Sequence, residues 1–311
     1  MGKRPDLSVI IVTHNGREMA LTTLRSARAR LGDLCAEWLV VDNGSTDGTP
    51  EAIEQAFDDV RVFRAENRGF AAGNNVALEH AAGRYVLLLN PDVEIEQGTF
   101  AELVAALDRR TEVGVASVLQ QGSDGRLLPS IRRLPTPIRD LGEALGASRI
   151  PLLRRIQELD EDFDRYGVER SADWLVGAFL LARREAVEQV GPMDEGFFLY
   201  SEEIDWCHRF RLSGWDVRHL PLMRVTHHGG DSERAEHVAQ LSSSRLRFAY
   251  KHFRRPRALG IHAALVLKHI LRLAVLVPTA ILRPALRKRA RAEAMGLAVL
   301  CGAASAPYGE R

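Results

Sequence analysis

Short apolar runs alternate with longer amphipathic segments over the first 120 residues of the chain. The apolar runs are rich in Val, Ile and Leu, which is typical of strands buried inside a sheet. The predicted strands are Leu7–Thr13, Trp38–Asp42, Val60–Ala65, Tyr85–Asn90 and Val113–Leu119. The predicted helices between them are Gly16–Leu31, Thr49–Phe57, Gly69–Ala82 and Gln97–Arg109. This order predicts an α/β fold with a mostly parallel sheet, right-handed crossovers and flanking helices.

Residues 120–172 interrupt this alternation with several prolines and a basic pair. An amphipathic stretch at Ile138–Gln157 predicts a helix within the segment. Long insertions in compact domains are often lids or binding loops, and we expect one of these roles here. The next predicted elements are the apolar segment Trp174–Ala182, a helix at Ser201–Leu212 and a strand at Trp215–His219.

The pattern changes again after Ser242. Ile261–Val277 is dense in Ala, Leu, Val and Ile, but it contains central charges, and Pro278 is expected to break or kink it. A spanning helix tolerates such charges poorly, so a basic amphipathic helix in the membrane interface fits better. The alternative is that its apolar face packs on the preceding α/β domain. The polar positions near one helical face are His262, His269, Arg272, Thr279 and Arg283. We therefore expect a domain of residues 1–242 and a basic, apolar helical region of residues 243–311.

The composition adds a charge asymmetry. The 311 residues carry a formal net charge of +1, and 46% hydrophobic and 27% charged residues are ordinary for a soluble globular protein. No Asp or Glu occurs between Arg245 and Arg291, so the two parts are expected to have different partners. The three cysteines are far apart without a CxxC motif, which favours a reducing compartment over disulfides or structural zinc. The short charged start of the chain predicts no signal peptide.

Carboxylates follow the fourth predicted strand in the segment Asn90-Pro91-Asp92-Val93-Glu94. Alternation along an extended chain would point Asp92 and Glu94 to the same side. Ligands of open α/β sheets bind at the carboxyl ends of the strands. Mg²⁺ and Mn²⁺ prefer oxygen ligands and commonly bridge carboxylates and a diphosphate. The segment therefore predicts a divalent-metal site, and the alternative is a solvated turn.

Two further strand ends carry candidate binding residues. Asp42 ends the second strand, where its carboxylate could accept the N3–H of uracil or thymine, whereas Asp47 fits a helix N-cap. The segment Glu66–Asn75 follows the third strand, and its glycines and opening helix could bind a phosphate. It matches neither a GxGxxG nor a Walker motif. The first strand is also followed by neither the GxGxxG of a dehydrogenase nor the basic, Gly-rich loop of a sugar-nucleotide pyrophosphorylase.

Three acids, Glu202, Glu203 and Asp205, follow a loop rich in Gly and aromatic residues. Crowded carboxylates raise one another's pKa, which suits a general base. The alternative is that they complement the helix dipole. Downstream, the adjacent His227 and His228 are expected in a loop bounded by Gly and are candidate metal or phosphate contacts.

Together these motifs resemble the inverting family 2 glycosyltransferases, whose nucleotide-diphospho-sugar-binding, Rossmann-like fold is called GT-A. The resemblance covers roughly Leu7 to Gly230. It is specific because VVDNGSTDGT, ENRGFAAGNN, LLLNPDVEI, GxMDExFF and EEIDWCHR occur together and in order. The Asn-Pro-Asp element and the segment WLVGAFLLAR look most like a rhamnosyltransferase-like branch. Some members of that branch act on polyprenyl-linked cell-wall or polysaccharide precursors.

The resemblance implies a role for each matching position. The expected catalytic residues are Glu203, as the base, and Asp205. The expected ligands of Mn²⁺ or Mg²⁺ are Asp92, Glu94 and His227, with His228 as an alternative to His227. The expected nucleotide-sugar-binding residues are Thr13, Asn15, Asp42, Asn43, Asn67, Arg68, Gly69, Asn74 and Asp92. The expected acceptor or lid residues are Trp174, Gly177, Glu202 and Trp206.

The mechanism implied is a single displacement, in which Glu203 takes a proton from an acceptor hydroxyl as it attacks the anomeric carbon. Two positions depart from the family pattern: Asn90 replaces the first acid of the Asp-x-Asp metal motif, and Glu203 stands where Asp is common. The expected donor is dTDP-L-rhamnose, and the alternatives are UDP-hexose or UDP-galactofuranose. A non-catalytic nucleotide-sugar-binding module is the alternative of another class.

The expected acceptor is a glycan or a polyprenyl-diphosphate-linked sugar, and the resemblance places the insertion at residues 120–172 on the acceptor side. We expect a cytoplasmic protein, peripheral at the inner face of the cell membrane through its C-terminal region. No nucleic-acid partner is expected.

Overall fold

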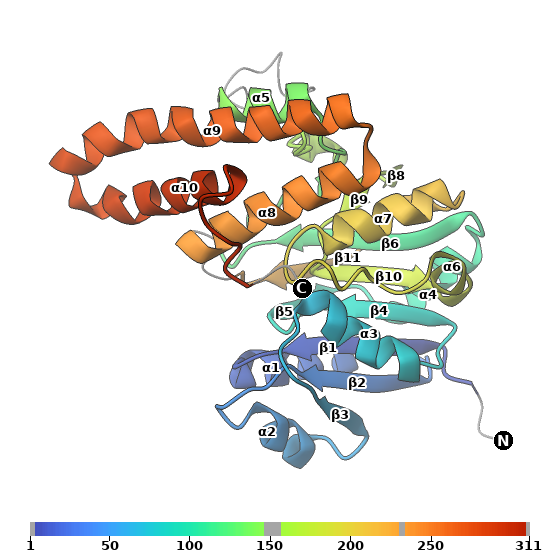
Figure 1. Cartoon of the computed structure of the whole chain (residues 1–311). Coiled ribbons are helices and arrows are strands. Elements are labelled where there is room, and N and C mark those ends of the chain that lie inside the picture. Colours follow the sequence, from blue (N-terminus) through green and yellow to red (C-terminus); the bar gives the residue numbers. More distant parts are fainter. Residues whose placement is uncertain (1–3, 146–156, 230–233, 309–311) are drawn as a thin grey trace. The chain divides into compact units, whose positions relative to one another are not determined.

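The computed structural model describes residues 4–145, 157–229 and 234–308, and the chain forms two compact units (Figure 1). The sheet unit comprises Met1–Arg132, Asp162–Glu195 and Glu202–Gly229. The helical unit comprises Arg133–Glu161, Gly196–Ser201 and Gly230–Arg311. The chain therefore passes from the sheet unit into the helical unit three times.

This division differs from the predicted one. The predicted boundary at residue 242 lies instead near residue 230, because α8 (Ala235–His252) packs with the later helices. The predicted insertion is also divided, since its middle part, Arg133–Glu161, belongs to the helical unit. Helix α5 (Pro137–Ala144) packs so closely on α9 (Arg255–Leu282) that a Cβ on Gly260 would lie 2.7 Å from Cγ of Pro137.

Nine of the described strands form one sheet in the order β3-β2-β1-β4-β10-β6-β11-β5, with β8 paired to β11. Strands β1 to β4, β6 and β11 share one direction, whereas β5, β8 and β10 run antiparallel to their neighbours. This mixed, mostly parallel sheet confirms the predicted fold class. The strands are β1 (Leu7–Thr13), β2 (Ala36–Asp42), β3 (Val60–Arg64), β4 (Tyr85–Leu89), β5 (Val93–Gln97), β6 (Val113–Gln121), β8 (Arg170–Ser171), β10 (Phe179–Arg183) and β11 (Asp216–His227).

The register of the parallel strands brings the polar strand ends to one edge of the sheet. Thr13 at the end of β1 is paired with Asp42 at the end of β2. Ile10 of β1 is paired with Leu88 of β4, so the residues just after β4 reach the same edge. The strands themselves are held by a large apolar core that includes Leu87 and other fully buried side chains.

Helices of the sheet unit occupy nearly all of the predicted positions. The predicted helix at Gln97–Arg109 begins later, because Val93–Gln97 forms β5, and Thr99 with Glu102 makes a capping box for the helix. The predicted apolar segment at Trp174–Ala182 contains two strands, β9 and β10, separated by a turn. The helices are α1 (Arg17–Ala29), α2 (Thr49–Ala56), α3 (Phe70–His80), α4 (Phe100–Asp108), α6 (Arg184–Val190) and α7 (Glu202–Leu212), with a 3-10 turn at Phe163–Arg165. A separate pair of short strands is β7 (Ile131–Arg132) and β9 (Trp174–Leu175).

The predicted strand at Trp215–His219 continues to His227 as β11. Its last residues pair antiparallel with β5, and His227 is opposite Val93. His227 therefore ends a strand, and its expected place in a loop is wrong. The pairing of β11 with β5 places His227 beside Asp92, which lies between β4 and β5.

The helical unit consists of α5, α8, α9 and α10 (Arg287–Leu300), with a 3-10 turn at Pro284–Leu286 (Figure 1). The prediction of a break at Pro278 is wrong, because α9 continues through it to Leu282. The hydroxyl of Thr279 donates to the carbonyl of Val275 beside this proline. Of the predicted helix at Ile138–Gln157, α5 covers the beginning, and residues 146–156 lie outside the described residues.

The central charges of α9 are paired inside the helical unit. Lys268 lies 2.8 Å from Glu143 of α5. His269 and Arg272 lie 2.6 Å and 3.0 Å from Glu293 of α10. The polar face of the helix is therefore directed at its neighbours within the unit.

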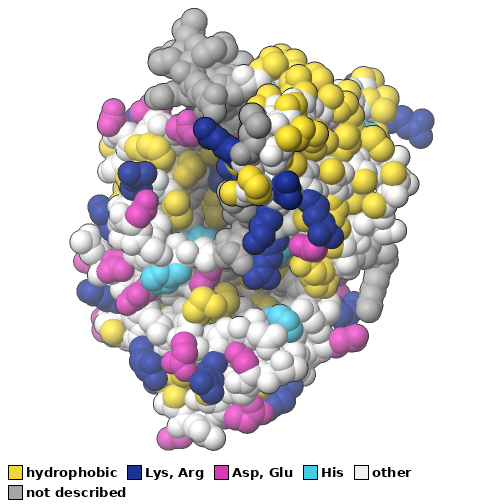
Figure 2. All heavy atoms as spheres, turned by 90° about the vertical axis from the view of Figure 1, so that its left-hand side faces the viewer, with side chains coloured by type: hydrophobic (Ala, Val, Ile, Leu, Met, Phe, Trp, Pro, Cys, Tyr) yellow, Lys and Arg dark blue, Asp and Glu magenta, His cyan; other side chains and the backbone are white. Residues whose placement is uncertain are grey.

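The opposite face of α9 carries exposed apolar residues three or four positions apart, which we call the apolar stripe. Figure 2 shows hydrophobic side chains gathered at the upper right, over helices of this unit, with Lys and Arg along the lower border. Residues Arg255–Ile281 are long and apolar enough to cross a membrane, judged by length and composition only. The apolar stripe consists of Leu259, Ala263, Leu267, Ile270, Ala274, Val277 and Ile281. This helix thus has its polar side inward and an apolar side outward.

Candidate active site

Three buried polar side chains follow one another at the ends of β1 and β2. Thr13, Asp42 and Asn43 are 1%, 2% and 4% exposed. Oγ1 of Thr13, Oδ1 of Asp42 and Oδ1 of Asn43 have no hydrogen-bond partner in the described parts of the chain. An unpaired buried polar atom costs about 1–3 kcal/mol, so donors from a ligand at this edge would be stabilising.

The carboxylate of Asp42 is held by its other oxygen. The backbone N–H of Ser45 donates to Oδ2 of Asp42 at 2.9 Å. Asn15 supports the same turn, since its backbone N–H donates to Ser45 and its side chain accepts from the N–H of Thr46, each at 2.8 Å. Asn15 has a φ of 51°, a conformation that Asn tolerates better than most residues. Its contacts make Asn15 a residue that positions Asp42.

The glycine-rich segment after β3 forms the start of α3. The N–H of Gly69, which has a φ of 96°, donates to the side chain of Asn67 at 3.2 Å. The side chain of Asn74 is buried and donates to the carbonyl of Phe70 at 2.9 Å, so its amide serves its own helix. Arg68 is half exposed and lies 2.9 Å from Glu195. A phosphate group would have to compete with Glu195 for this guanidinium.

Asp92 and His227 form a pair suited to a divalent cation. Oδ1 of Asp92 lies 3.4 Å from Nε2 of His227 and has no hydrogen-bond partner among the described residues. Two ligands bonded to one ion at about 2.1 Å and at about 90–110° to each other would be about 3.0–3.4 Å apart. The pair therefore fits two neighbouring positions on Mg²⁺ or Mn²⁺, with other positions left for water or phosphate oxygens.

Glu94 lies apart from this pair. Its carboxylate is 3.4 Å from Nε2 of His228, whose Nδ1 is 3.0 Å from the hydroxyl of Ser123. Alternation does not relate Asp92 to Glu94, because Asp92 precedes β5. Among the described residues, no three His, Cys, Asp or Glu side chains converge to hold a metal ion.

Glu203 lies in the first turn of α7 beside Gly177. A Cβ on Gly177 would lie 3.3 Å from Cβ of Glu203, so glycine leaves the room that the glutamate occupies. Glu202 is 4% exposed, and burial, followed by the charge of Glu203, raises the pKa of Glu202 well above its usual value. This shift favours the neutral form of Glu202.

Two expected functional residues of α7 belong to the core. Trp206 is fully buried and donates to the carbonyl of Gly191 at 3.0 Å, so its indole N–H is engaged within the protein, and its role beside the acceptor stays a prediction. Asp205 is also fully buried and lies 2.8 Å from Arg209, which donates to the carbonyl of Pro192 at 2.7 Å. These contacts tie Asp205 to the loop before α7, and its catalytic role stays a prediction. Trp174, expected beside the acceptor, is 5% exposed with its ring 5.5 Å from the guanidinium of Arg132.

The sequence matches the family model described as "Glycosyl transferase family 2" over residues 8–191, more than half of the chain. The chain belongs to glycosyltransferase family 2. It is a glycosyltransferase with the GT-A fold, which confirms the resemblance seen in its motifs.

Curated relatives of this glycosyltransferase include rhamnosyltransferases. The N-acetylglucosaminyl-diphospho-decaprenol L-rhamnosyltransferase of Mycobacterium tuberculosis is 33% identical over 221 residues, which cover 65% of this chain and 70% of the relative. The rhamnosyltransferase WbbL of Escherichia coli is 22% identical over 54% of this chain and 63% of its own length.

Among solved structures, the mannosyltransferase PcManGT of Pyrobaculum calidifontis, in complex with GDP-Man and Mn²⁺, has a TM-score of 0.59. It is 18% identical, over 96% of this chain and 87% of that protein. This likeness supports the fold of the glycosyltransferase.

The sequence did not lead us to expect a role for Asn75, which positions a loop of the glycosyltransferase. Asn75 in α3 is buried and holds the loop before α7 with both ends of its amide. Its Nδ2 donates to the carbonyl of Met193, and the N–H of Met193 donates to its Oδ1, both at 2.9 Å. Nδ2 also lies 3.1 Å from Glu195. The pair Asn74-Asn75 inside an otherwise apolar helix is the sequence feature that could have indicated it.

Proposed function

We propose that this glycosyltransferase transfers L-rhamnose from dTDP-L-rhamnose to a hydroxyl of a polyprenyl-diphosphate-linked glycan. The observation that carries the proposal is the 33% identity to the mycobacterial L-rhamnosyltransferase over most of both chains. Asp42 supports a pyrimidine nucleotide, since one carboxylate oxygen is fixed by Ser45 and the other lacks a partner among the described residues. That oxygen would accept the N3–H of thymine, a donor that uracil also has.

The reaction is a single displacement with inversion. Glu203 accepts the proton of the acceptor hydroxyl while the oxygen forms a bond to the anomeric carbon and the bond to the diphosphate breaks. Asp92 and His227 would hold Mn²⁺ or Mg²⁺, which as a Lewis acid would neutralise charge on the departing diphosphate. Burial raises the pKa of Glu202 and so favours the form that adds no negative charge beside the base, and Gly177 leaves the base its space.

The proposed site of action is the inner face of the cell membrane. The apolar stripe of α9 offers a face that water solvates poorly, and the exposed basic residues that follow it are suited to anionic headgroups. These basic residues are Arg283, Arg287, Lys288, Arg289 and Arg291. A helix lying in the interface can insert such a stripe while its paired polar face stays with the protein.

Thermal unfolding of the purified chain with dTDP, UDP, GDP and NAD, each with and without Mn²⁺, tests the donor. A ligand present at 100 times its Kd adds about 2.7 kcal/mol to the free energy of unfolding. We expect stabilisation by dTDP that depends on Mn²⁺ and is absent with NAD. No effect of any pyrimidine diphosphate would overturn the donor assignment.

A transfer assay tests the reaction itself. The chain is incubated with dTDP-L-rhamnose, or with UDP-hexoses and UDP-galactofuranose, and a synthetic polyprenyl-diphosphate-linked N-acetylglucosamine. Mass spectrometry should detect one added deoxyhexose from dTDP-L-rhamnose alone. A product formed only from a UDP-sugar would assign the other donor class, and binding without any product would favour a non-catalytic module.

A further inference from the structure

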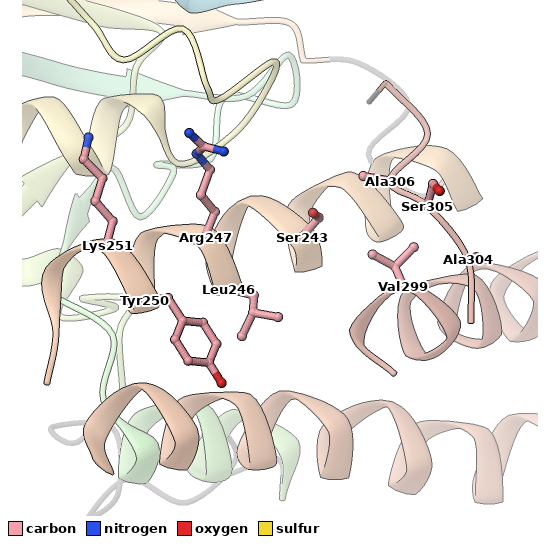
Figure 3. A pocket seen from close by; sticks show the side chains of 9 residues that line it. All are labelled: Ser243, Leu246, Arg247, Tyr250, Lys251, Val299, Ala304, Ser305 and Ala306. Atoms are coloured by element: carbon pink, nitrogen blue, oxygen red, sulfur yellow. The ribbon is translucent and has the colours of Figure 1, made fainter. Parts of the chain in front are cut away.

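The helical unit contains a cavity of about 810 Å³ that none of the roles above uses. It is lined by α8, by Val299 of α10 and by the tail that follows α10 (Figure 3). Figure 3 shows Arg247 and Lys251 extending to one side of α8, whereas Leu246 and Tyr250 extend to the other. The cavity thus has a cationic side and a largely apolar side.

Within the described residues, Arg247 is held by an aromatic ring rather than by a carboxylate. Its guanidinium carbon lies 5.4 Å from the centre of the Phe197 ring, and Nζ of Lys251 lies 5.6 Å from the same ring. Gly196 allows this approach, because a Cβ there would collide with the guanidinium. The ring orients both cations, and a neutral ring does not cancel the charge of the Arg247 guanidinium.

Arg245, two residues earlier in the same helix, has a different environment. Arg245 is buried between the carboxylates of Asp140, at 3.0 Å, and Glu158. Nε of Arg247 is likewise buried, yet it has no hydrogen-bond partner anywhere in the described ranges. A buried N–H of a guanidinium without an acceptor costs free energy, and an anion in the cavity would supply the acceptor.

We propose that this cavity binds the phosphoryl group of a lipid phosphate. Arg247 would contact phosphate oxygens through its planar fork and Lys251 as a point charge, and the hydroxyl of Ser305 lies in the same lining. Leu246 and Val299 would contact the first part of the hydrocarbon chain. The amphiphilic lining distinguishes this ligand from free inorganic phosphate, which has nothing to place on the apolar side.

Two sources supply this chemistry: the diphosphate of a polyprenyl carrier and the headgroup of an anionic phospholipid. The first source rests on the proposed function, whose acceptor carries such a diphosphate, whereas the second does not. Failure of this binding would leave the proposed transfer reaction standing, because the binding experiment contains no nucleotide sugar.

Isothermal calorimetry on the full chain tests the proposal with farnesyl diphosphate, farnesol and inorganic diphosphate. We expect farnesyl diphosphate to bind at least tenfold more tightly than either of the others. Arg247→Gln should weaken this binding at least tenfold, whereas Arg255→Gln, at an exposed arginine outside the lining, should not change it. Equal binding by wild type and Arg247→Gln, or equal binding of farnesol, would overturn the proposal.

Gly196→Ala gives a second test that keeps every charge. The new Cβ should displace the guanidinium of Arg247, so binding of farnesyl diphosphate should weaken with the net charge unchanged. Circular dichroism checks that each variant is folded. Competition by phosphatidylglycerol vesicles that is lost in Arg247→Gln would assign the phospholipid headgroup, and binding of farnesyl diphosphate without such competition would assign the carrier lipid. Unchanged binding in folded Gly196→Ala would contradict the placement of the site.

Discussion

The apolar stripe of α9 makes a quantitative prediction about membrane binding. Ile270 and Ile281 are 46% and 74% exposed and lie on the same face of the helix. The double variant Ile270→Ser and Ile281→Ser removes most of their apolar surface from that face. It leaves the ion pairs of the opposite face untouched.

The expected loss follows from the exposed fractions. The exposed fractions of the two side chains add up to about 1.2, which is the surface of slightly more than one fully exposed isoleucine. Burying one such side chain completely contributes about 1.5–3 kcal/mol. Insertion of both would therefore contribute about 1.8–3.6 kcal/mol to membrane binding. This corresponds to a partition coefficient lower by a factor on the order of 20 to 400 in the double variant.

Co-sedimentation with phosphatidylglycerol-containing vesicles measures the partition coefficient. The matched control is Val168→Ser with Leu212→Ser, since these residues of the sheet unit are 54% and 69% exposed. The control removes as much exposed apolar surface from another part of the chain and should partition like wild type. A loss of less than twofold in the α9 variant, or an equal loss in the control, would refute the reasoning.

The active site makes four further predictions. Glu203→Gln should lower kcat by about 10²–10⁴-fold and leave dTDP binding unchanged by calorimetry, and near wild-type turnover would remove Glu203 as the base. Asp92→Asn should weaken Mn²⁺-dependent donor binding by about tenfold or more, because a Lewis-acid contact is worth several kcal/mol, and unchanged affinity would remove it as a ligand. Gly177→Ala crowds Cβ of Glu203 and should lower kcat by roughly 3- to 10-fold with the donor Kd unaltered, whereas a changed Kd alone would contradict this reading. Because the pKa of Glu202 is higher in the folded chain than in the unfolded chain, rising pH deprotonates Glu202 in the unfolded chain before it does so in the folded chain. The contribution of Glu202 to the free energy of unfolding therefore falls as pH rises above about 4.5. Glu202→Gln should flatten that fall in thermal melts across pH, and parallel curves for variant and wild type would contradict the shift.

The polar edge of the sheet at the ends of β1 and β2 could be predicted because it depends on local patterns. Apolar strand, turn and helix repeat in order, and parallel pairing carries the strand ends at Thr13 and Asp42 to one edge. The pairing of Asp92 with His227 could not be predicted in the same way. It depends on β11 running antiparallel to β5, a contact between segments about 130 residues apart.

The faces of α9 show a second limit. The sequence predicts an amphipathic helix, but periodicity alone does not state which face is turned inward. That choice depends on Glu143 and Glu293, acids on two other helices that pair with Lys268 and Arg272. The same kind of distant pairing, between Arg245 and Asp140, draws part of the predicted insertion into the helical unit.

The six residues Gly196–Ser201 have a consequence for how the enzyme can be cut or recombined. They belong to the helical unit, where Leu199 accepts a hydrogen bond from Ser244 at 2.8 Å, yet the next residue begins α7, which carries the proposed base Glu203. We call residues Gly196–Ser201 the strap. A truncation before α8 would remove Ser244, which donates to the strap, and Arg247, which packs on its Phe197 ring. The strap would then lack both contacts. The C-terminal helices are therefore not a detachable anchor, and a chimaera that exchanges them must exchange the strap and residues 133–161 with them.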